Sequence, residues 1–229
     1  MKKQALLLLN MGGPNTVDEV EMFLYNMFSD KNILNMNPYL RAFVRTIIIT
    51  KRLDEVKENF KEHLGGKSPL PSLTNQLILK LQEKLSMKIA PAMRYVPPFA
   101  TEALEVFKKD GVEELILFPM YPQYSTTTTL SSVEDIEARC EALDYHPNIK
   151  LIEPYYDDYD YIEMCATKIM EAFEDKNTQE YDLLLSAHGL PMSIIKAGDP
   201  YQNQIEGNVS ALRTYFHQKG IKFNNIKLV

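Results

Sequence analysis

Cysteine is scarce in this 229-residue sequence, which has only Cys140 and Cys165. Two widely separated cysteines exclude a disulfide framework and a cysteine-rich zinc site, and such usage is typical of a cytoplasmic protein. The N-terminal apolar run, residues 5–9, is too short for the core of a secretion signal or for a membrane span. We therefore interpret this run as the first strand of a soluble domain.

Positive charge is also in the minority, with 25 Lys and Arg against 31 Asp and Glu, a formal charge of −6. The negative net charge of the chain does not attract nucleic acid, so any anionic ligand must bind to Lys or Arg side chains placed at its site. The chain also lacks G-x-S-x-G, H-E-x-x-H, C-x-x-C and G-x-G-x-x-G motifs. These absences weigh against serine hydrolases, zinc proteases and dinucleotide oxidoreductases.

Apolar residues make up 45% of the chain and charged residues 24%, which is ordinary for a globular protein. Short apolar strands alternate with helical periodicity about six times, and this order predicts a doubly wound α/β fold with parallel sheets. We divide the chain into a first domain, residues 1–125, and a second domain, residues 126–229. The second domain is expected to be incomplete, because it ends on a strand with no covering helix.

Two strand ends draw attention to Met11 and His188. Three leucines at 183–185 predict a buried strand that ends at His188, and carboxyl ends of parallel strands line the binding crevice of open α/β sheets. The same pattern of strand and turn recurs around Met11. When Gly12-Gly13-Pro14 is matched to Gly189-Leu190-Pro191, the leucines at 6–8 match those at 183–185 and Met11 matches His188. Two similar halves would place Met11 and His188 on opposite sides of an interdomain cleft. From spacing alone His188 is either a ligand-facing or a structural residue.

Three other segments lead to specific expectations. The segment that begins at Ile33 and ends at Arg52 is basic and amphipathic; it is either a helix packed on the core with solvated arginines or a lip that touches an apolar ligand or a membrane. Residues 126–129, all threonine, predict a β-prone linker. Ser131 and Glu134 form a capping box at the start of the next helix.

The strand ends together offer one imidazole, one guanidinium, hydroxyls, aromatic rings and a thioether. This inventory suits a large, flat ligand with anionic groups, a proton acceptor at its centre and a metal. Six motifs then resemble the ferrochelatase family, in that family's order. They are Leu9-Asn10-Met11-Gly12-Gly13-Pro14, Gly66-Lys67-Ser68-Pro69, Met93-Arg94-Tyr95, Tyr121-Pro122-Gln123-Tyr124-Ser125, Ser186-Ala187-His188-Gly189-Leu190-Pro191 and Gly198-Asp199-Pro200-Tyr201.

The resemblance implies a lyase that inserts Fe(II) into a porphyrin, protoporphyrin IX or coproporphyrin, during haem synthesis. It also implies two Rossmann-like domains with a cleft between them. His188 matches the family's active-site histidine, which takes pyrrole protons or binds the iron. The remaining matches are expected to bind the porphyrin: Met11, Arg94, Tyr95, Tyr124 and Ser125 along the pocket, with Arg94 near charge or a propionate, and Ser68 and Arg52 near the propionates.

In the family, the sequence usually continues beyond the position of residue 229 and includes a glutamate that partners the histidine. We therefore expect this chain to lack the C-terminal part of the family, and we make no prediction about whether it is active without that part. No tightly bound cofactor and no iron–sulfur cluster are expected, with Fe(II) acting as substrate. Two alternatives remain: a non-catalytic porphyrin or haem carrier, and a nucleotide-binding or oxidoreductase domain that uses the turn after Met11. We expect a cytoplasmic location, with the lip as a peripheral membrane contact on the inner face.

Overall fold

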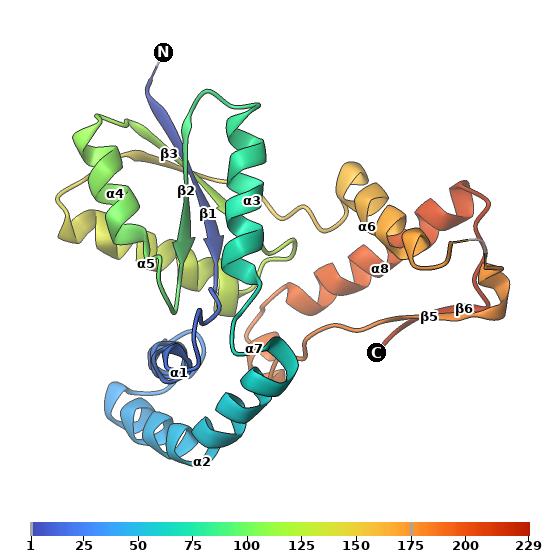
Figure 1. Cartoon of the computed structure of the whole chain (residues 1–229), viewed down its shortest axis with the longest axis horizontal. Helices are drawn as coiled ribbons and strands as arrows, with labels where there is room; N and C mark the ends of the chain where they lie inside the picture. Colours follow the sequence, from blue (N-terminus) through green and yellow to red (C-terminus); the bar gives the residue numbers. More distant parts are fainter. Residues whose placement is uncertain (1, 175) are drawn as a thin grey trace. The chain divides into compact units, whose positions relative to one another are not determined.

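The computed structural model describes residues 2–174 and 176–229. The chain forms two compact units, one comprising residues up to 121 together with 126–152, the other comprising 122–125 together with 153–229. Each unit contains a sheet whose strands all run parallel, flanked by helices (Figure 1). The predicted α/β architecture with parallel sheets is therefore confirmed.

The first unit is built on a four-stranded sheet in the order β2-β1-β3-β4. Strand β1 (Gln4–Asn10) lies between β2 (Lys88–Met93) and β3 (Glu114–Pro119), and β4 (Asn148–Leu151) extends the sheet beyond β3. The five apolar residues inside β1 are all buried, which explains their run without alternation, because a central parallel strand is covered on both faces.

Helices cover both faces of this sheet (Figure 1). Leu6 and Leu8 of β1 pack toward α3 (Leu70–Gln82), while Leu7 and Leu9 face the other side. That second side carries α4 (Ala100–Lys109) and α5 (Ser131–Ala142), whose buried apolar residues are Ala100, Leu104, Phe107, Ile136 and Cys140. The period-two alternation of a strand thus divides one leucine run between two cores.

Helices α1 (Glu19–Ser29) and α2 (Pro38–Leu64) lie beside each other after β1 (Figure 1). The Asn37 side chain caps α2, and Gly65 ends it with a φ of +62°. The 27-residue α2 has no buried residue, so packing on a core is wrong for the segment of residues 33–52. Among the helices that the structure describes, none has the length and apolar content needed to cross a membrane.

The arginines at the start of α2 are not simply solvated. The Arg41 guanidinium donates to the backbone carbonyls of Leu34, Ser29 and Met36, at 3.1, 3.2 and 2.8 Å. Arg45 donates to the Ser29 hydroxyl at 2.7 Å and lies over the Tyr25 ring. These two side chains therefore tie α2 to the carboxyl end of α1, where carbonyls lack helical partners.

The boundary between the units differs from the predicted division at residue 125. Residues 126–152 belong to the first unit, because β4 pairs with β3, while 122–125 belong to the second. The threonine run is also not a linker. It forms η1 (Thr126–Leu130), a π-helical turn continuous with α5, with Thr127 and Thr129 buried. Burial of these side chains overrides their β propensity.

The second unit contains a two-stranded parallel sheet of β5 (Asp182–Leu185) and β6 (Asn225–Leu228). Leu183, Leu185 and Ile226 pack against α6 (Tyr159–Glu171) and α8 (Tyr201–Gln218), around buried Ile162, Ala166, Leu212 and Phe216. The 3₁₀ turn η2 (Thr178–Glu180) precedes β5, and the short helix α7 (Met192–Lys196) lies between β5 and α8.

The sequence similarity between the two strand-and-turn segments does not extend to their backbone conformation. Gly12 has a φ of +85°, and a Cβ at this position would lie 2.7 Å from a methyl carbon of Val96. The matching Gly189 has no positive φ, and nothing lies within 4 Å of an added Cβ. Only the first turn therefore requires glycine.

Candidate functional site

The candidate site residues of the first unit follow directly from the sheet. Asn10 ends β1, and its carbonyl accepts a hydrogen bond from Arg94 N–H at 2.8 Å. The Met11 carbonyl accepts from Tyr95 N–H at 3.0 Å. Parallel pairing thus continues beyond the ends of β1 and β2, and it places Met11, Arg94 and Tyr95 together at the carboxyl edge. Met11 is 37% exposed there.

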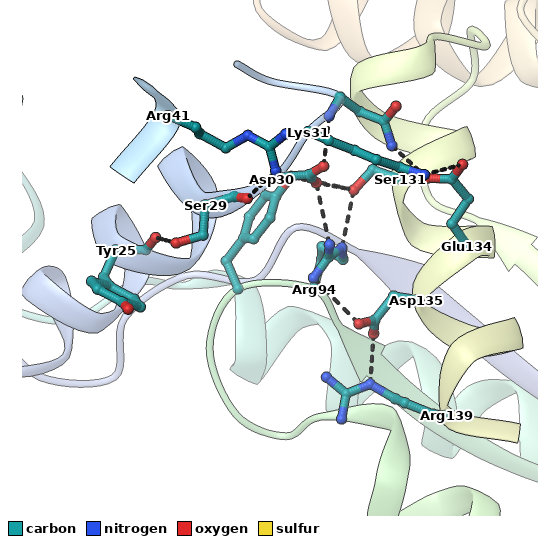
Figure 2. Close-up of polar contacts among 12 residues, drawn as sticks. Tyr25, Ser29, Asp30, Lys31, Arg41, Arg94, Ser131, Glu134, Asp135 and Arg139 are labelled. Atoms are coloured by element: carbon teal, nitrogen blue, oxygen red, sulfur yellow. Dashed lines mark hydrogen bonds and ion pairs between the residues drawn. The ribbon is translucent and has the colours of Figure 1, made fainter. Parts of the chain in front are cut away.

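The Arg94 guanidinium is surrounded by partners from the same unit (Figure 2). Its Nη2 lies 3.3 Å from Asp30 Oδ2, its Nη1 lies 3.3 Å from Asp135 Oδ1, and its Nε donates to Ser131 Oγ at 3.0 Å. Asp135 also pairs with Arg139 at 2.7 Å, so two carboxylates balance two guanidinium groups. Arg94 is therefore part of an internal ionic network, and its contact with a propionate stays a prediction.

Tyr95 belongs to the same network. Its hydroxyl donates to Asp30 Oδ2 at 2.9 Å, and its ring packs edge-on against Phe23. Only 2% of this residue is exposed. Burial, followed by the negative charge of Asp30, raises the pKa of the Tyr95 hydroxyl well above its usual range. Tyr95 is thus a neutral hydrogen-bond donor at any physiological pH, with its hydroxyl directed at Asp30.

The capping box predicted from Ser131 and Glu134 is wrong, because both side chains have other partners. Ser131 Oγ donates to Asp30 and is no cap for α5. Glu134 pairs with Lys31 at 3.0 Å and accepts from the Asn32 amide at 2.7 Å (Figure 2). The capping-box residues instead join the start of α5 to the chain that follows α1.

A small polar cavity of about 240 Å³ lies beside this network. Its walls come from α1 and the residue after it, from the residue that follows β2, from the N-cap of α4 and from the last turn of α5. They are formed by Asn26, Ser29, Asp30, Arg94, Phe99 and Arg139. The cavity is lined mainly by polar and charged side chains.

Ser68 and Arg52 lie elsewhere in the first unit. Ser68 is buried, with its N–H donating to the Pro14 carbonyl at 2.9 Å and its hydroxyl accepting from Leu70 N–H at 3.2 Å. It packs so closely on Gly13 that a Cβ there would lie 2.7 Å from Ser68 Cβ. Arg52 is exposed on α2. The structure thus places Ser68 next to the turn after Met11, and the propionate role of both residues stays a prediction.

His188 lies three residues beyond β5 in the second unit and is exposed. The preceding Ala187 N–H donates to the Val229 carbonyl at 3.2 Å, which continues the pairing with β6. The backbone of His188 hydrogen-bonds the Tyr201 hydroxyl, whose pKa is raised by burial. His188 is therefore held by its backbone at the carboxyl end of a parallel strand, as the sequence predicts, with its side chain accessible.

Tyr124 and Ser125 also gather near the start of α8. Ser125 is 1% exposed, and its hydroxyl donates to Asp199 Oδ2 at 2.9 Å. Asp199 Oδ1 accepts from Tyr201 N–H at 3.0 Å, and the Tyr124 N–H donates to Gln204 Oε1 at 2.7 Å. One end of α8 thus links the Tyr124–Ser125 segment to the backbone of His188. Direct porphyrin contact by Tyr124 and Ser125 stays a prediction.

Three buried or partly buried carboxylates in these networks were not predicted as site residues. Asp30 and Asp135 carried no motif that marks them. Asp199 lies inside a Gly-Asp-Pro turn, and a carboxylate before a helix start is a capping signal. Within residues 2–174 and 176–229, no group of three or more His, Cys, Asp or Glu is arranged to hold a metal ion. Cys140 and Cys165 are both free thiols.

Two units with parallel sheets, each presenting side chains where strands end, define an α/β protein of the kind that binds its ligand at strand carboxyl ends. A family model described as Ferrochelatase matches residues 3–227. Ferrochelatase from Wolinella succinogenes is 44% identical over 226 residues, covering 98% of this chain and 71% of the relative. Those from Nitratiruptor sp. and Helicobacter pylori G27 are 45% and 42% identical, covering 94% and 99% of this chain and 70% and 68% of the relatives.

The chain belongs to the ferrochelatase family. The match runs through both units and includes every motif that carried the resemblance. It leaves about 30% of each relative's length without a counterpart in these 229 residues.

Proposed function

We propose that this chain inserts Fe(II) into a porphyrin as a lyase of haem biosynthesis. The observation that carries the proposal is family membership over residues 3–227, with relatives named ferrochelatase at 42–45% identity. Nothing favours the non-catalytic carrier over the enzyme. A dinucleotide-binding role lacks its glycine signature in the sequence.

Metal insertion releases two protons, because two pyrrole N–H groups lose their hydrogens as four nitrogens bind the divalent ion. His188 is the proposed acceptor, since an imidazole accepts and releases protons near neutral pH and also presents a neutral nitrogen to iron. Its exposed side chain at the end of β5 supports this role. Fe(II) enters as a substrate.

The porphyrin also has to be bent, so that its nitrogen lone pairs point toward the metal. Binding energy at the rim of the macrocycle is available for that distortion if the protein surface is fixed. Met11 supplies a polarisable thioether at the edge of the first sheet. We propose that Arg94 and Tyr95 support the surface around Met11. We also propose that the rim of the macrocycle contacts Ser68, Arg52, Tyr124 and Ser125.

The function is tested by mixing the protein with protoporphyrin IX or coproporphyrin under reducing, oxygen-free conditions and then adding Fe(II) or Zn(II). Metalation changes the visible absorption bands, so enzyme-dependent metalation supports the proposal, and the faster porphyrin is the preferred substrate. Porphyrin binding without metalation identifies the carrier, and no binding contradicts both. Binding of a nucleotide without porphyrin would favour the nucleotide-binding alternative.

We further propose that the protein holds no resident cofactor and no iron–sulfur cluster. These 229 residues support the proposal, because their two cysteines are fewer than the four thiolates such clusters usually require. Metal analysis and the absorption spectrum of protein purified without oxygen test it. Stoichiometric iron with sulfide and a broad visible band would contradict the proposal.

We also propose a cytoplasmic location with peripheral membrane contact through α2. Tyr39, Phe43 and Ile47 form a stripe at helical spacing and are 89%, 63% and 39% exposed. Sedimentation with vesicles of mixed neutral and anionic lipid tests the contact. Binding that falls in Phe43→Asp but not in Glu58→Gln, a change on the polar part of the same helix, supports it; equal binding by both variants contradicts it.

A further inference from the structure

Asp30 occupies a position that should disfavour a carboxylate. It directly follows α1, and the carboxyl end of a helix carries a partial negative charge that repels anions. Asp30 is also only 5% exposed, and burial of a charge without compensation is costly. A carboxylate that is both buried and placed at the carboxyl end of a helix requires strong stabilising contacts. Residues that are locally unfavourable in this way occur most often at functional sites.

The compensation comes from four hydrogen-bond donors around one side chain (Figure 2). Asp30 Oδ1 accepts from Asn32 N–H at 2.8 Å. Oδ2 accepts from the Tyr95 hydroxyl at 2.9 Å, lies 3.3 Å from Arg94 Nη2 and also accepts from Ser131 Oγ. The carboxylate therefore joins the end of α1, the end of β2 and the start of α5 at one point.

Arg94 and Tyr95 connect the Asp30 carboxylate to the exposed carboxyl edge of the first sheet. The backbone of Tyr95 holds the Met11 carbonyl, and the backbone of Arg94 holds that of Asn10. The Tyr95 side chain is held in turn by Asp30 and by the ring of Phe23. A continuous chain of contacts thus runs from the buried carboxylate to the exposed Met11.

We propose that Asp30 is a positioning residue for porphyrin binding, which fixes Arg94 and Tyr95 and, through the Tyr95 backbone, the Met11 side of the strand end. The inference rests on the proposed function, because it assigns Met11 to the porphyrin surface. Asp30 itself touches neither porphyrin nor iron in this role. Its removal loosens the surface against which the macrocycle is bent.

The test is Asp30→Asn, which keeps the shape of the side chain and removes its charge. The porphyrin KM and the porphyrin Kd from fluorescence quenching are expected to rise about fivefold, with kcat at saturating porphyrin within about twofold. Tyr95→Phe removes the hydroxyl that contacts Asp30 and Ser131 and keeps the ring, and it is expected to raise KM by a smaller factor. This variant also tests the inference if Asp30→Asn does not fold.

Glu134→Gln is the matched control. Glu134 also joins the chain after α1 to α5, through Lys31 and Asn32, yet it makes no contact with Arg94 or Tyr95. It is expected to leave the porphyrin KM within about twofold of wild type. An equal rise in Glu134→Gln would show that Asp30 acts only by tethering α1 to α5, and would overturn the inference.

The outcomes separate the inference from the proposed function. A lower kcat with an unchanged KM in Asp30→Asn indicates loss of folded protein only and overturns the positioning role. An unchanged KM in Tyr95→Phe overturns it as well. A wild-type chain that binds no porphyrin contradicts the proposed function and removes the basis of the inference, whereas normal wild-type binding with normal Asp30→Asn binding contradicts the inference alone.

Discussion

The hydroxyl of Ser125 donates to Asp199 Oδ2 at 2.9 Å, and neither residue is more than 7% exposed. This contact joins the short segment before η1 to the start of α8 inside the second unit. A buried carboxylate that loses a donor costs about 1–3 kcal/mol, since water does not replace the lost hydrogen bond. The contact should therefore contribute measurably to the stability of this unit.

We predict that Ser125→Ala and Asp199→Asn are coupled. Each change alone lowers the free energy of unfolding, and the double variant loses less than the sum by about 1–2 kcal/mol, because one change removes the donor and the other removes the charge of the acceptor in the same hydrogen bond. Urea unfolding at neutral pH measures the coupling. Ser125→Ala combined with Asp157→Asn, an exposed carboxylate of the same unit, should be additive. Additive effects of the first pair would contradict a direct interaction.

The two turns that resemble each other in sequence should respond differently to alanine. Gly12→Ala places a side chain at a φ of +85° and 2.7 Å from a Val96 methyl carbon, which together should cost about 2–4 kcal/mol. Gly189→Ala meets no neighbour within 4 Å and should change stability by less than about 0.5 kcal/mol. Equal losses in thermal unfolding would show that both turns need glycine.

Glu114 should make the stability of the first sheet sensitive to acid. Hydrogen bonds from Lys150 and then Gln4 hold the pKa of this carboxyl below its ordinary value of 4.5. A lowered folded-state pKa contributes stability that is present above the unfolded value and is lost as the pH falls through the folded value. Glu114→Gln should therefore be less stable than wild type at pH 7.

Below about pH 4 the gap between wild type and Glu114→Gln should shrink, because protonation removes the charge that the variant already lacks. Urea midpoints at pH 7 and at pH 3.5 provide the comparison. Glu113→Gln, at the exposed neighbouring position, serves as the control. A gap that stays constant between the two pH values would contradict the assigned role of the Lys150 and Gln4 contacts.

Much of the fold was predictable, because the uninterrupted apolar run of β1 is what a parallel strand covered on both faces requires. The leucines before His188 also form a parallel strand, but the prediction that this strand is buried is wrong, since Leu184 is 57% exposed. The division of the chain into units was not predictable, because the order of apolar segments along the sequence does not say which strands pair. Strand β4 pairs with β3, so residues 126–152 belong to the first unit. The helical threonine run shows the same limit, since burial of Thr127 and Thr129 outweighs local propensity.

Within the site, the sequence indicated strand-end residues such as Met11 and His188, because the end of an apolar run can be read directly. It did not indicate their supports. Asp30 follows an ordinary helix, and only the three-dimensional structure brings it within hydrogen-bond distance of Tyr95, 65 positions later in the chain. Ser131 was predicted to be a helix cap for the same reason. The spacing of Ser131 and Glu134 fits a capping box, and the sequence does not show that the Ser131 hydroxyl donates to the distant Asp30.

The central claim, that His188 is the proton acceptor of porphyrin metalation, is tested most directly by comparing His188→Ala with wild type in one absorption assay. Metalation by the variant should fall at least about 100-fold, the usual contribution of a positioned base, while porphyrin Kd stays within about twofold. His217→Ala, an exposed histidine on α8, should metalate like wild type. Metalation by His188→Ala at the wild-type rate would contradict the claim.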